Sequence, residues 1–252
     1  MPAPRALLLD FGGVIADSPR RQAEEVLPRV AQRVKQLTGD LLTEDEIVSE
    51  LRRADAMRDR LRDSAHDYAE VTPVRLWGEL VADLWPQDAR ERLVAHAGEL
   101  TYLWSHRPSW RLVDGIAELL DHTVAVGLPV AVVSNTRCGQ AHRDVLERLG
   151  VAPAFAVQIY SDEIGVCKPH PEMIWSAARA LNVPASACWM VGDTLHKDVA
   201  CARKAGAGAA ILMITTGSDS ADGDDALTDR ASGLGDADAT VRNGQELLRL
   251  LG

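Results

Sequence analysis

The feature that most constrains the fold is a series of short apolar runs that end in polar residues and are separated by amphipathic segments. The run over residues 5–9 ends at Asp10, and the run Leu128–Val133 ends at Ser134. A third run ends shortly before Asp193. Short, continuously apolar runs of this kind are typical of parallel strands that are buried on both faces. Because strands alternate with helices, the sequence predicts βαβ units and an α/β fold with a Rossmann-like parallel sheet core.

The segment between the first strand and residue 108 has a different pattern. Apolar residues recur there at helical spacing, without a strand-like run, and predict four helices: Arg20–Leu37, Thr43–Asp63, Asp67–Leu84 and Pro86–Trp104. We therefore predict a core domain formed by residues 1–18 and 108–252 and an inserted α-helical cap domain over residues 19–107. Residues 217–238 are rich in Gly, Ser and Asp, and they predict a surface loop.

Composition and charge narrow the choice of partners. The formal net charge is −10, which argues against nucleic-acid binding because that requires a basic surface. The charge also disfavours anionic lipid, and no apolar stretch reaches the roughly 20 residues of a membrane span. Four well-separated cysteines and the absence of a secretory signal pattern predict reduced thiols and a cytoplasmic localisation. An anionic ligand would need a local positive site rather than a favourable overall field.

The polar residues at the strand ends predict a common site, because ligands of parallel sheets bind beyond the carboxyl ends of the strands. Asp10, Ser134 and Asp193 stand at such ends, and Lys168 follows the predicted strand Ala156–Tyr160. A carboxylate can attack phosphorus and divide a difficult hydrolysis into two steps. Two carboxylates suit Mg²⁺, while a hydroxyl and an ammonium group can bind phosphoryl oxygens. Each residue taken alone could equally cap a helix or a turn.

Four ordered segments resemble the motifs of the haloacid dehalogenase-like (HAD) hydrolase superfamily, in its phosphatase type with a helical cap between motifs one and two. The segments are Asp10-Phe11-Gly12-Gly13-Val14, Val132-Val133-Ser134-Asn135, Gly165-Val166-Cys167-Lys168-Pro169-His170-Pro171, and Val191-Gly192-Asp193 with Asp198. The resemblance covers essentially the whole predicted core. The family's cap falls where this sequence becomes helical.

This resemblance implies a Mg²⁺-dependent phosphomonoesterase that acts on a small, soluble phosphorylated metabolite through an aspartyl-phosphate intermediate. It implies that the catalytic residues are Asp10 as nucleophile, Ser134 and Lys168. The substrate-binding residues that it implies are Gly13, Ser134, Asn135 and Lys168. The metal ligands that it implies are Asp10, the main-chain carbonyl of Gly12, Asp193 and Asp198.

The sequence departs from the family pattern at Gly12. Phosphatases of this family usually carry a second Asp at this position, which protonates the leaving group and then activates water. Loss of a general acid–base typically lowers the rate by about 10²–10⁴-fold. Either the substrate has a good leaving group, or another residue supplies the acid, with Asp17, Asp63 and His66 as candidates. As a third explanation, the chain is a weakened relative.

Two further function classes stay open at this point. The chain could be a non-catalytic or weakly active protein that binds a phosphorylated ligand, although a pure binder has little use for the nucleophile Asp10. It could also be a haloacid dehalogenase, but that reaction needs no Mg²⁺ and the Gly192-Asp193 segment resembles a metal motif. Phosphonate cleavage would need a lysine in the cap, where Lys35 is the only one. The substrate and the oligomeric state are not determined by the sequence.

Overall fold

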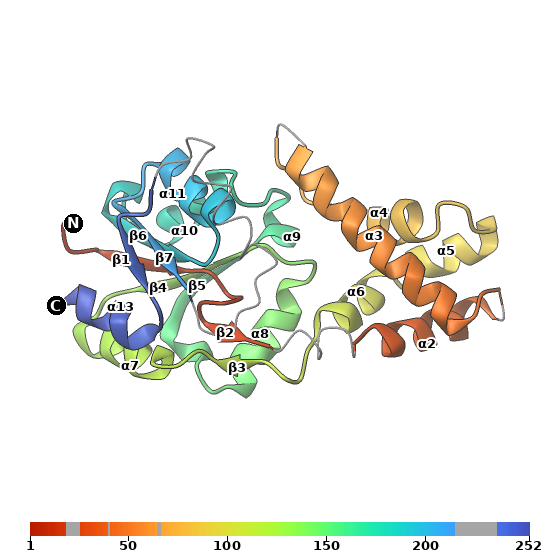
Figure 1. Ribbon diagram of the computed structural model, residues 1–252, viewed down its shortest axis with the longest axis horizontal. Helices are drawn as coiled ribbons and strands as arrows, with labels where there is room; N and C mark the ends of the chain where they lie inside the picture. The colour runs from red at the N-terminus through yellow and green to blue at the C-terminus, as the bar shows by residue number, and fades with distance from the viewer. Residues whose placement is uncertain (19–25, 40, 65–66, 215–235) are drawn as a thin grey trace.

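The computed structural model describes residues 1–18, 26–39, 41–64, 67–214 and 236–252. A parallel sheet with covering helices lies at one end of the molecule, and a separate group of helices lies at the other (Figure 1). Every pairing between neighbouring strands of this sheet is parallel. Across the sheet the strands are β5 (Phe155–Tyr160), β4 (Val130–Ser134), β1 (Ala6–Leu9), β6 (Cys188–Gly192), β7 (Ala209–Met213) and β8 (Ala239–Val241). The predicted α/β fold class is confirmed.

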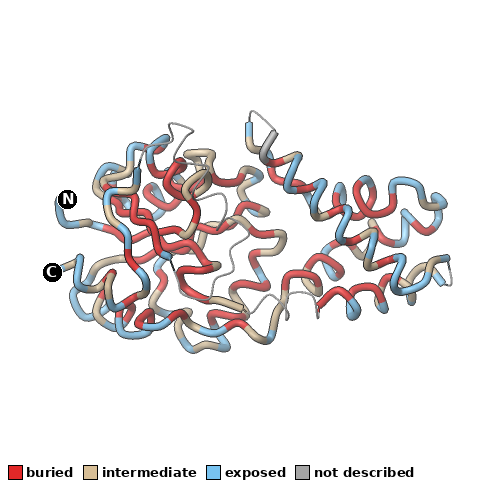
Figure 2. Tube along the Cα trace, in the orientation of Figure 1, coloured by how far each residue is buried: buried red, intermediate tan, exposed pale blue. Residues whose placement is uncertain are grey.

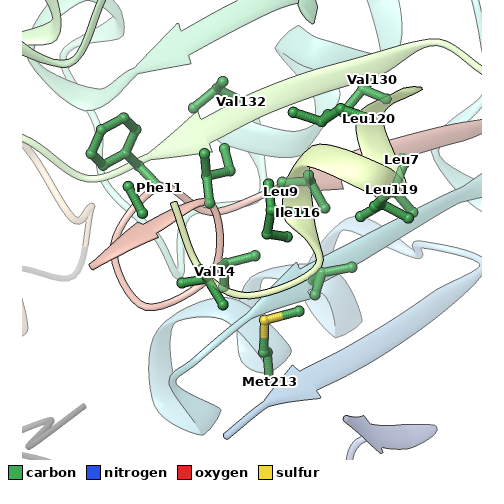
Figure 3. Packing of buried hydrophobic residues seen from close by; sticks show 14 of the residues in the cluster. Leu7, Leu9, Phe11, Val14, Ile116, Leu119, Leu120, Val130, Val132 and Met213 are labelled. Carbon is green, nitrogen blue, oxygen red and sulfur yellow. The ribbon is translucent and has the colours of Figure 1, made fainter. Parts of the chain in front are cut away.

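Helices cover both faces of the sheet because its central strands are apolar on both sides. Leu7 and Leu9 of β1 pack into one cluster, and Ala6 and Leu8 pack into another, as the two-residue period of a strand requires. The first cluster includes residues of α7 (Ile116–Val126), α8 (Gly139–Arg148) and α13 (Gly244–Leu251), and Figure 3 shows part of it. The second cluster includes residues of α10 (Glu172–Ala180) and α11 (Ala200–Ala205).

The order of the strands determines where a ligand can bind. From β1 the chain moves outward to β4 and β5, and it then returns to the other side of β1 to form β6, β7 and β8. The direction of winding therefore reverses at β1. In open α/β sheets this reversal leaves a crevice at the carboxyl ends of the strands. The ends of β1, β4 and β6 lie side by side there.

A helical insertion separates the short strands β2 (Ala16–Asp17) and β3 (Arg111–Leu112), which pair antiparallel. Its helices pack around a hydrophobic cluster of their own, drawn from residues 26–104 (Figure 2). They are α2 (Val26–Thr38), α3 (Glu44–Ser64), α4 (Pro73–Arg75), the π-helical η1 (Leu76–Val81), α5 (Gln87–Ala95) and α6 (Ala97–Ser105). That this insertion is a cap with boundaries at residues 19 and 107 remains our proposal. Among the described residues, no helix is long and apolar enough to cross a membrane.

The structure corrects several predicted boundaries. The predicted helix Asp67–Leu84 begins only at Pro73, after the N-cap Thr72, because proline suits the first helical turn and disfavours helix in the residue before it. Upstream, Ala69 forms an antiparallel bridge with Val166 of the core. The predicted helix Pro86–Trp104 is divided at His96. The strands β2, β3 and β8 were not predicted because two or three residues carry no readable period, and most of the predicted loop 217–238 lies outside the described residues.

Candidate active site

Three carboxylates meet at the carboxyl edge of the sheet. Asp10 follows β1, Asp193 follows β6, and Asp198 lies in the short π-helical turn η4 (Leu195–Val199). Each offers an oxygen atom, and these atoms lie within 4.8 Å of one another. Two glycines allow this approach. A Cβ atom on Gly13, whose φ is +70°, would come within 2.4 Å of Asp193 Oδ2, and a Cβ on Gly192 within 2.1 Å of Asp198 Cβ.

Lys168 supplies the counter-charge to this cluster. Its Nζ lies 2.7 Å from Asp10 Oδ1 and 2.6 Å from Asp198 Oδ1, and it donates to the Val133 carbonyl at 2.9 Å. Burial raises the pKa of Asp10 to about 6, since the attraction of Lys168 offsets only part of the desolvation and Asp198 adds repulsion. Burial opposes the charged form of Lys168, but the two carboxylates outweigh it and raise its pKa. The lysine therefore stays charged and relieves the repulsion among the acids.

Two neighbouring side chains hold these groups in place. The Asn135 amide donates to the Lys168 carbonyl at 3.0 Å and accepts from the Lys168 N–H at 2.7 Å. Thr194 donates to Asp198 Oδ2 from its N–H at 3.0 Å and from its hydroxyl at 2.6 Å. Asn135 is predicted to bind substrate; it lines the cavity, and its side-chain amide positions the backbone of Lys168. Thr194 was not predicted, because its role depends on the tight turn into η4.

A cavity of about 320 Å³ opens in front of these residues. All but one of the predicted site residues line it: Asp10, Gly12, Ser134, Asn135, Lys168, Asp193 and Asp198. The sequence did not indicate the rest of the lining, which comes from the helical insertion, its connection to β3, the loop after β4, α8, and the segment after β6 that includes η4. These residues are Arg58, Arg62, Ser105, Arg107, Trp110, Thr136, Arg137, His142, Thr194 and Lys197.

Other predicted residues are placed elsewhere. Gly13 does not line the cavity, and its N–H donates to the Ala16 carbonyl at 3.0 Å, so it is not available to a phosphoryl group. Its role is to let the backbone pass close to Asp193. Asp17 belongs to β2, and its carboxylate accepts from the Ser18 N–H rather than facing the cavity. The Asp63 side chain and His66 lie outside the described residues.

The space beside Gly12 is bounded by aromatic rings. A Cβ atom built on Gly12 would meet one neighbour within 4 Å among the described residues, Trp110 Cη2 at 3.8 Å. The His142 ring stacks on Phe11 with centroids 3.9 Å apart. Burial, together with the charges of Arg107 and Lys168, lowers the pKa of His142 to about 3. A neutral imidazole of this kind is a poor proton donor at neutral pH.

The donor set fits a hard divalent cation. Carboxylate oxygens are preferred by Mg²⁺, and a cluster of three crowded carboxylates favours a bound cation that offsets their mutual repulsion. Asp10 and Asp193 could bind such an ion directly, with the Gly12 carbonyl beside them. Asp198 is already ion-paired with Lys168 and accepts a hydrogen bond from Thr194. It could therefore stabilise the metal site without binding the ion directly.

Comparison with known proteins agrees with this geometry. A model of the haloacid dehalogenase-like hydrolase family matches residues 4–206, most of the chain. A glyceraldehyde 3-phosphate phosphatase from Pyrococcus abyssi is 31% identical over a stretch that covers 44% of this chain. The same stretch covers 46% of that relative, so the chain spans less than half the length of the relative it matches.

Two solved structures share the fold over nearly their whole length. A HAD phosphatase from Thermococcus onnurineus has a TM-score of 0.63 at 21% identity, with 98% of this chain and 97% of that chain covered. A 2-haloacid dehalogenase from Pseudomonas syringae pv. Tomato has a TM-score of 0.62 at 20% identity, with the same coverage. At this identity the two likenesses concern the fold alone. The match of the family model, over most of the chain, shows that the protein belongs to the haloacid dehalogenase-like hydrolase family, as its four motifs predicted.

Proposed function

We propose that the protein is a Mg²⁺-dependent phosphomonoesterase that acts on a small phosphorylated metabolite, with Asp10 as the nucleophile. The observation that carries this proposal is the cluster of Asp10, Asp193 and Asp198 beside the buried ammonium of Lys168. A phosphoryl group needs a nucleophile and positive charge in one place. The matched relatives that are named phosphatases support the same reaction class.

The chain's own residues would divide the reaction into two steps. In the first, an Asp10 oxygen forms a bond to phosphorus as the bond between phosphorus and the alcohol oxygen breaks, and the departing alkoxide takes a proton from water. In the second, water attacks the phosphorus of the aspartyl-phosphate and releases phosphate and the free Asp10 carboxylate. Bound Mg²⁺ would supply positive charge to the phosphoryl oxygens. Lys168 keeps Asp10 oriented and adds positive charge, and the Ser134 hydroxyl lies on the cavity wall to donate to the phosphoryl group.

The surroundings of Gly12 favour a substrate with a good leaving group. The acidic side chains on the described cavity wall are Asp10, Asp193 and Asp198, all of which belong to the carboxylate cluster. His142 is uncharged at neutral pH. The described part of the wall therefore offers no free carboxylic acid to protonate a poor leaving group, and an anomeric or acyl phosphate would need the least help.

The two alternative functions account for less of the site. A haloacid dehalogenase shares the fold, as the Pseudomonas syringae structure illustrates, but its metal-free reaction gives no role to three crowded carboxylates. A protein that only binds a phosphorylated ligand gives no role to a nucleophile held by Lys168 at the entrance to a cavity. The phosphatase proposal uses both features.

The test is phosphate release from a panel of small phosphomonoesters that differ in leaving group. We expect turnover with Mg²⁺, its loss in EDTA, and its loss in the Asp10→Asn variant, because both the metal and the nucleophile are required. Asp17→Asn, which removes an acid that does not face the cavity, is the matched control and should retain activity. Ligand binding without phosphate release would instead support a binding protein, and halide release that resists EDTA would support a dehalogenase.

A further inference from the structure

Six cationic residues and three acidic residues line the cavity, although the whole protein has a net charge of −10. Lys168 and Lys197 lie on the wall formed by the sheet domain. The rest of the cationic wall is arginine: Arg58 and Arg62 from α3, Arg107 from the connection after α6, and Arg137 from the loop after β4. A single phosphoryl group beside a metal ion does not require so many cations.

Some of these arginines already have carboxylate partners. Arg58 Nη2 lies 2.8 Å from Glu70 Oε1, and Arg62 Nε lies 3.8 Å from the same carboxylate. Arg137 is ion-paired with Asp55. Arg107 differs, because among the described residues its recorded contact is with the face of the Trp110 ring, 5.6 Å from guanidinium carbon to ring centroid.

Arg107 lies within electrostatic reach of another cation. Burial lowers the pKa of Arg107, and the charge of Arg137 lowers it further, although Asp55, the ion-pair partner of Arg137, partly opposes this shift. Arg107 and Lys168 both lower the pKa of His142, which places the imidazole within the fields of the catalytic lysine and of this arginine. Asp55 is one carboxylate for two guanidinium groups, so an anionic ligand between them would relieve the remaining repulsion on this partly desolvated wall.

Uncharged donors on the same wall also lack partners. The Ser105 hydroxyl and the Trp110 indole N–H belong to side chains with 7% and 9% exposure, and neither has a hydrogen-bond partner within the described part of the chain. The same holds for Arg137 Nε. Buried donors normally have acceptors, so this end of the cavity suits a ligand that is rich in acceptor oxygens.

We infer that the substrate carries a second anionic group, a carboxylate or a second phosphate, and that Arg107 binds it together with Arg137 and the Ser105 hydroxyl. This inference rests on the proposed phosphatase function for the orientation of the ligand, with its reacting phosphoryl group at Asp10. The second anion then lies at the end of the cavity formed by the helical insertion. A cavity of about 320 Å³ limits the ligand to a small metabolite.

The test compares matched compounds that differ only in the second anion. The pairs are 3-phosphoglycerate with glycerol 3-phosphate, 6-phosphogluconate with glucitol 6-phosphate, and fructose 1,6-bisphosphate with fructose 6-phosphate. Affinities are measured by calorimetry with Mg²⁺ in the Asp10→Asn protein, which cannot turn the ligands over. We expect the more anionic member of at least one pair to bind roughly tenfold tighter or better, as a charge-assisted contact provides. The first two pairs test whether the second anion is a carboxylate, and the third pair tests whether it is a phosphate.

Substitutions then identify the residues that bind the anion. Arg107→Gln should lower the ratio of the two affinities by roughly tenfold, while the exposed Arg92→Gln, which removes the same charge from the insertion, should leave the ratio unchanged. Ser105→Ala keeps every charge and should lower the ratio by a smaller factor, which provides a second test if Arg107→Gln folds poorly. A ratio below about twofold in every pair, or a ratio insensitive to both substitutions, would overturn the inference.

Turnover of the same compounds by the protein with Asp10 intact separates the two proposals. Phosphate release without any preference for the second anion would overturn the inference and leave the phosphatase proposal standing. Preferential binding without phosphate release, from these compounds and from every member of the leaving-group panel, would support the inference and overturn the phosphatase proposal.

Discussion

Gly12 leaves room for a Cβ atom beside Asp10, the proposed nucleophile. A Cβ there would be 3.8 Å from Trp110 Cη2, an ordinary van der Waals distance, so it would not clash with the described residues around it. Gly13 is different, because a Cβ would overlap Asp193 and its φ is in the left-handed region. The two adjacent glycines therefore differ. The backbone geometry requires glycine at position 13, whereas position 12 has room for a Cβ atom.

We predict that Gly12→Asp restores a general acid and base. The rate with a poor leaving group, such as an alkyl phosphate, should rise by at least about tenfold, within the range that acid–base catalysis contributes. The rate with an activated aryl phosphate should change little, because its leaving group needs no proton. Both rates are read from steady-state phosphate release. Gly12→Asn, of nearly the same size but without an acidic proton, is the control, and equal rates in the two variants would contradict the prediction.

At the scale of elements, the segment 67–72 links the helical insertion to the loop that carries Lys168. The Glu70 N–H donates to the Gly165 carbonyl at 2.9 Å, and the Cys167 N–H donates to the Tyr68 carbonyl at 2.9 Å. The Glu70 carboxylate is shared between the two parts, since it accepts from Arg58 of α3 at 2.8 Å and from the Ser161 hydroxyl after β5 at 2.6 Å. The side chains of Glu70 and Arg58 are 2% and 4% exposed.

We predict that Glu70→Leu lowers the free energy of unfolding by about 3–5 kcal/mol, because Arg58 is left charged and buried without its partner. The double variant Glu70→Leu/Arg58→Met should recover most of this loss, since it removes both charges. Urea denaturation followed by circular dichroism measures the wild type, the single variants Glu70→Leu and Arg58→Met, and the double variant. Additive losses in the double variant would show that the two side chains are not coupled.

For the whole molecule, the distribution of charge matters more than its total. The chain carries a net charge of −10, and three of its acidic residues meet at the sheet edge while arginines, two of them from α3, line the same cavity. The first group suits a cation and the second suits an anion. Folding brings the two groups to one cavity, and neither can be recognised from the net charge.

We predict that Mg²⁺ stabilises the whole protein through the carboxylate cluster. At a concentration 100 times its Kd, a ligand of the folded state contributes about 2.7 kcal/mol. For a chain of this size that raises Tm by roughly 5–10 °C. Thermal unfolding with Mg²⁺ and with EDTA measures the shift. Asp193→Asn should abolish most of it and Asp17→Asn should preserve it, whereas an equal shift in Asp193→Asn would place the ion elsewhere.

The sequence by itself determined the residues whose position depends on their own strand. Asp10, Ser134 and Asp193 follow apolar runs, and parallel strands bring their carboxyl ends to one edge, so local pattern was enough to predict that they lie together. Lys168 and Asp198 came from the resemblance of their motifs. Pairings over two or three residues, such as β2 with β3, escaped prediction because they have no period to detect.

Only the tertiary structure decided what else faces these residues. Arg58, Ser105 and Arg107 come from or beside an insertion with its own hydrophobic cluster, and helical spacing gives which of its residues are buried but not where the insertion docks. His142 lies on a helix of the core, where stacking on Phe11 turns it toward the cavity. Docking depends on long-range contacts between separate packed units. For that reason the gathering of Asp10, Ser134 and Asp193 at one sheet edge could be predicted from the sequence, while the wall that would select the substrate could not.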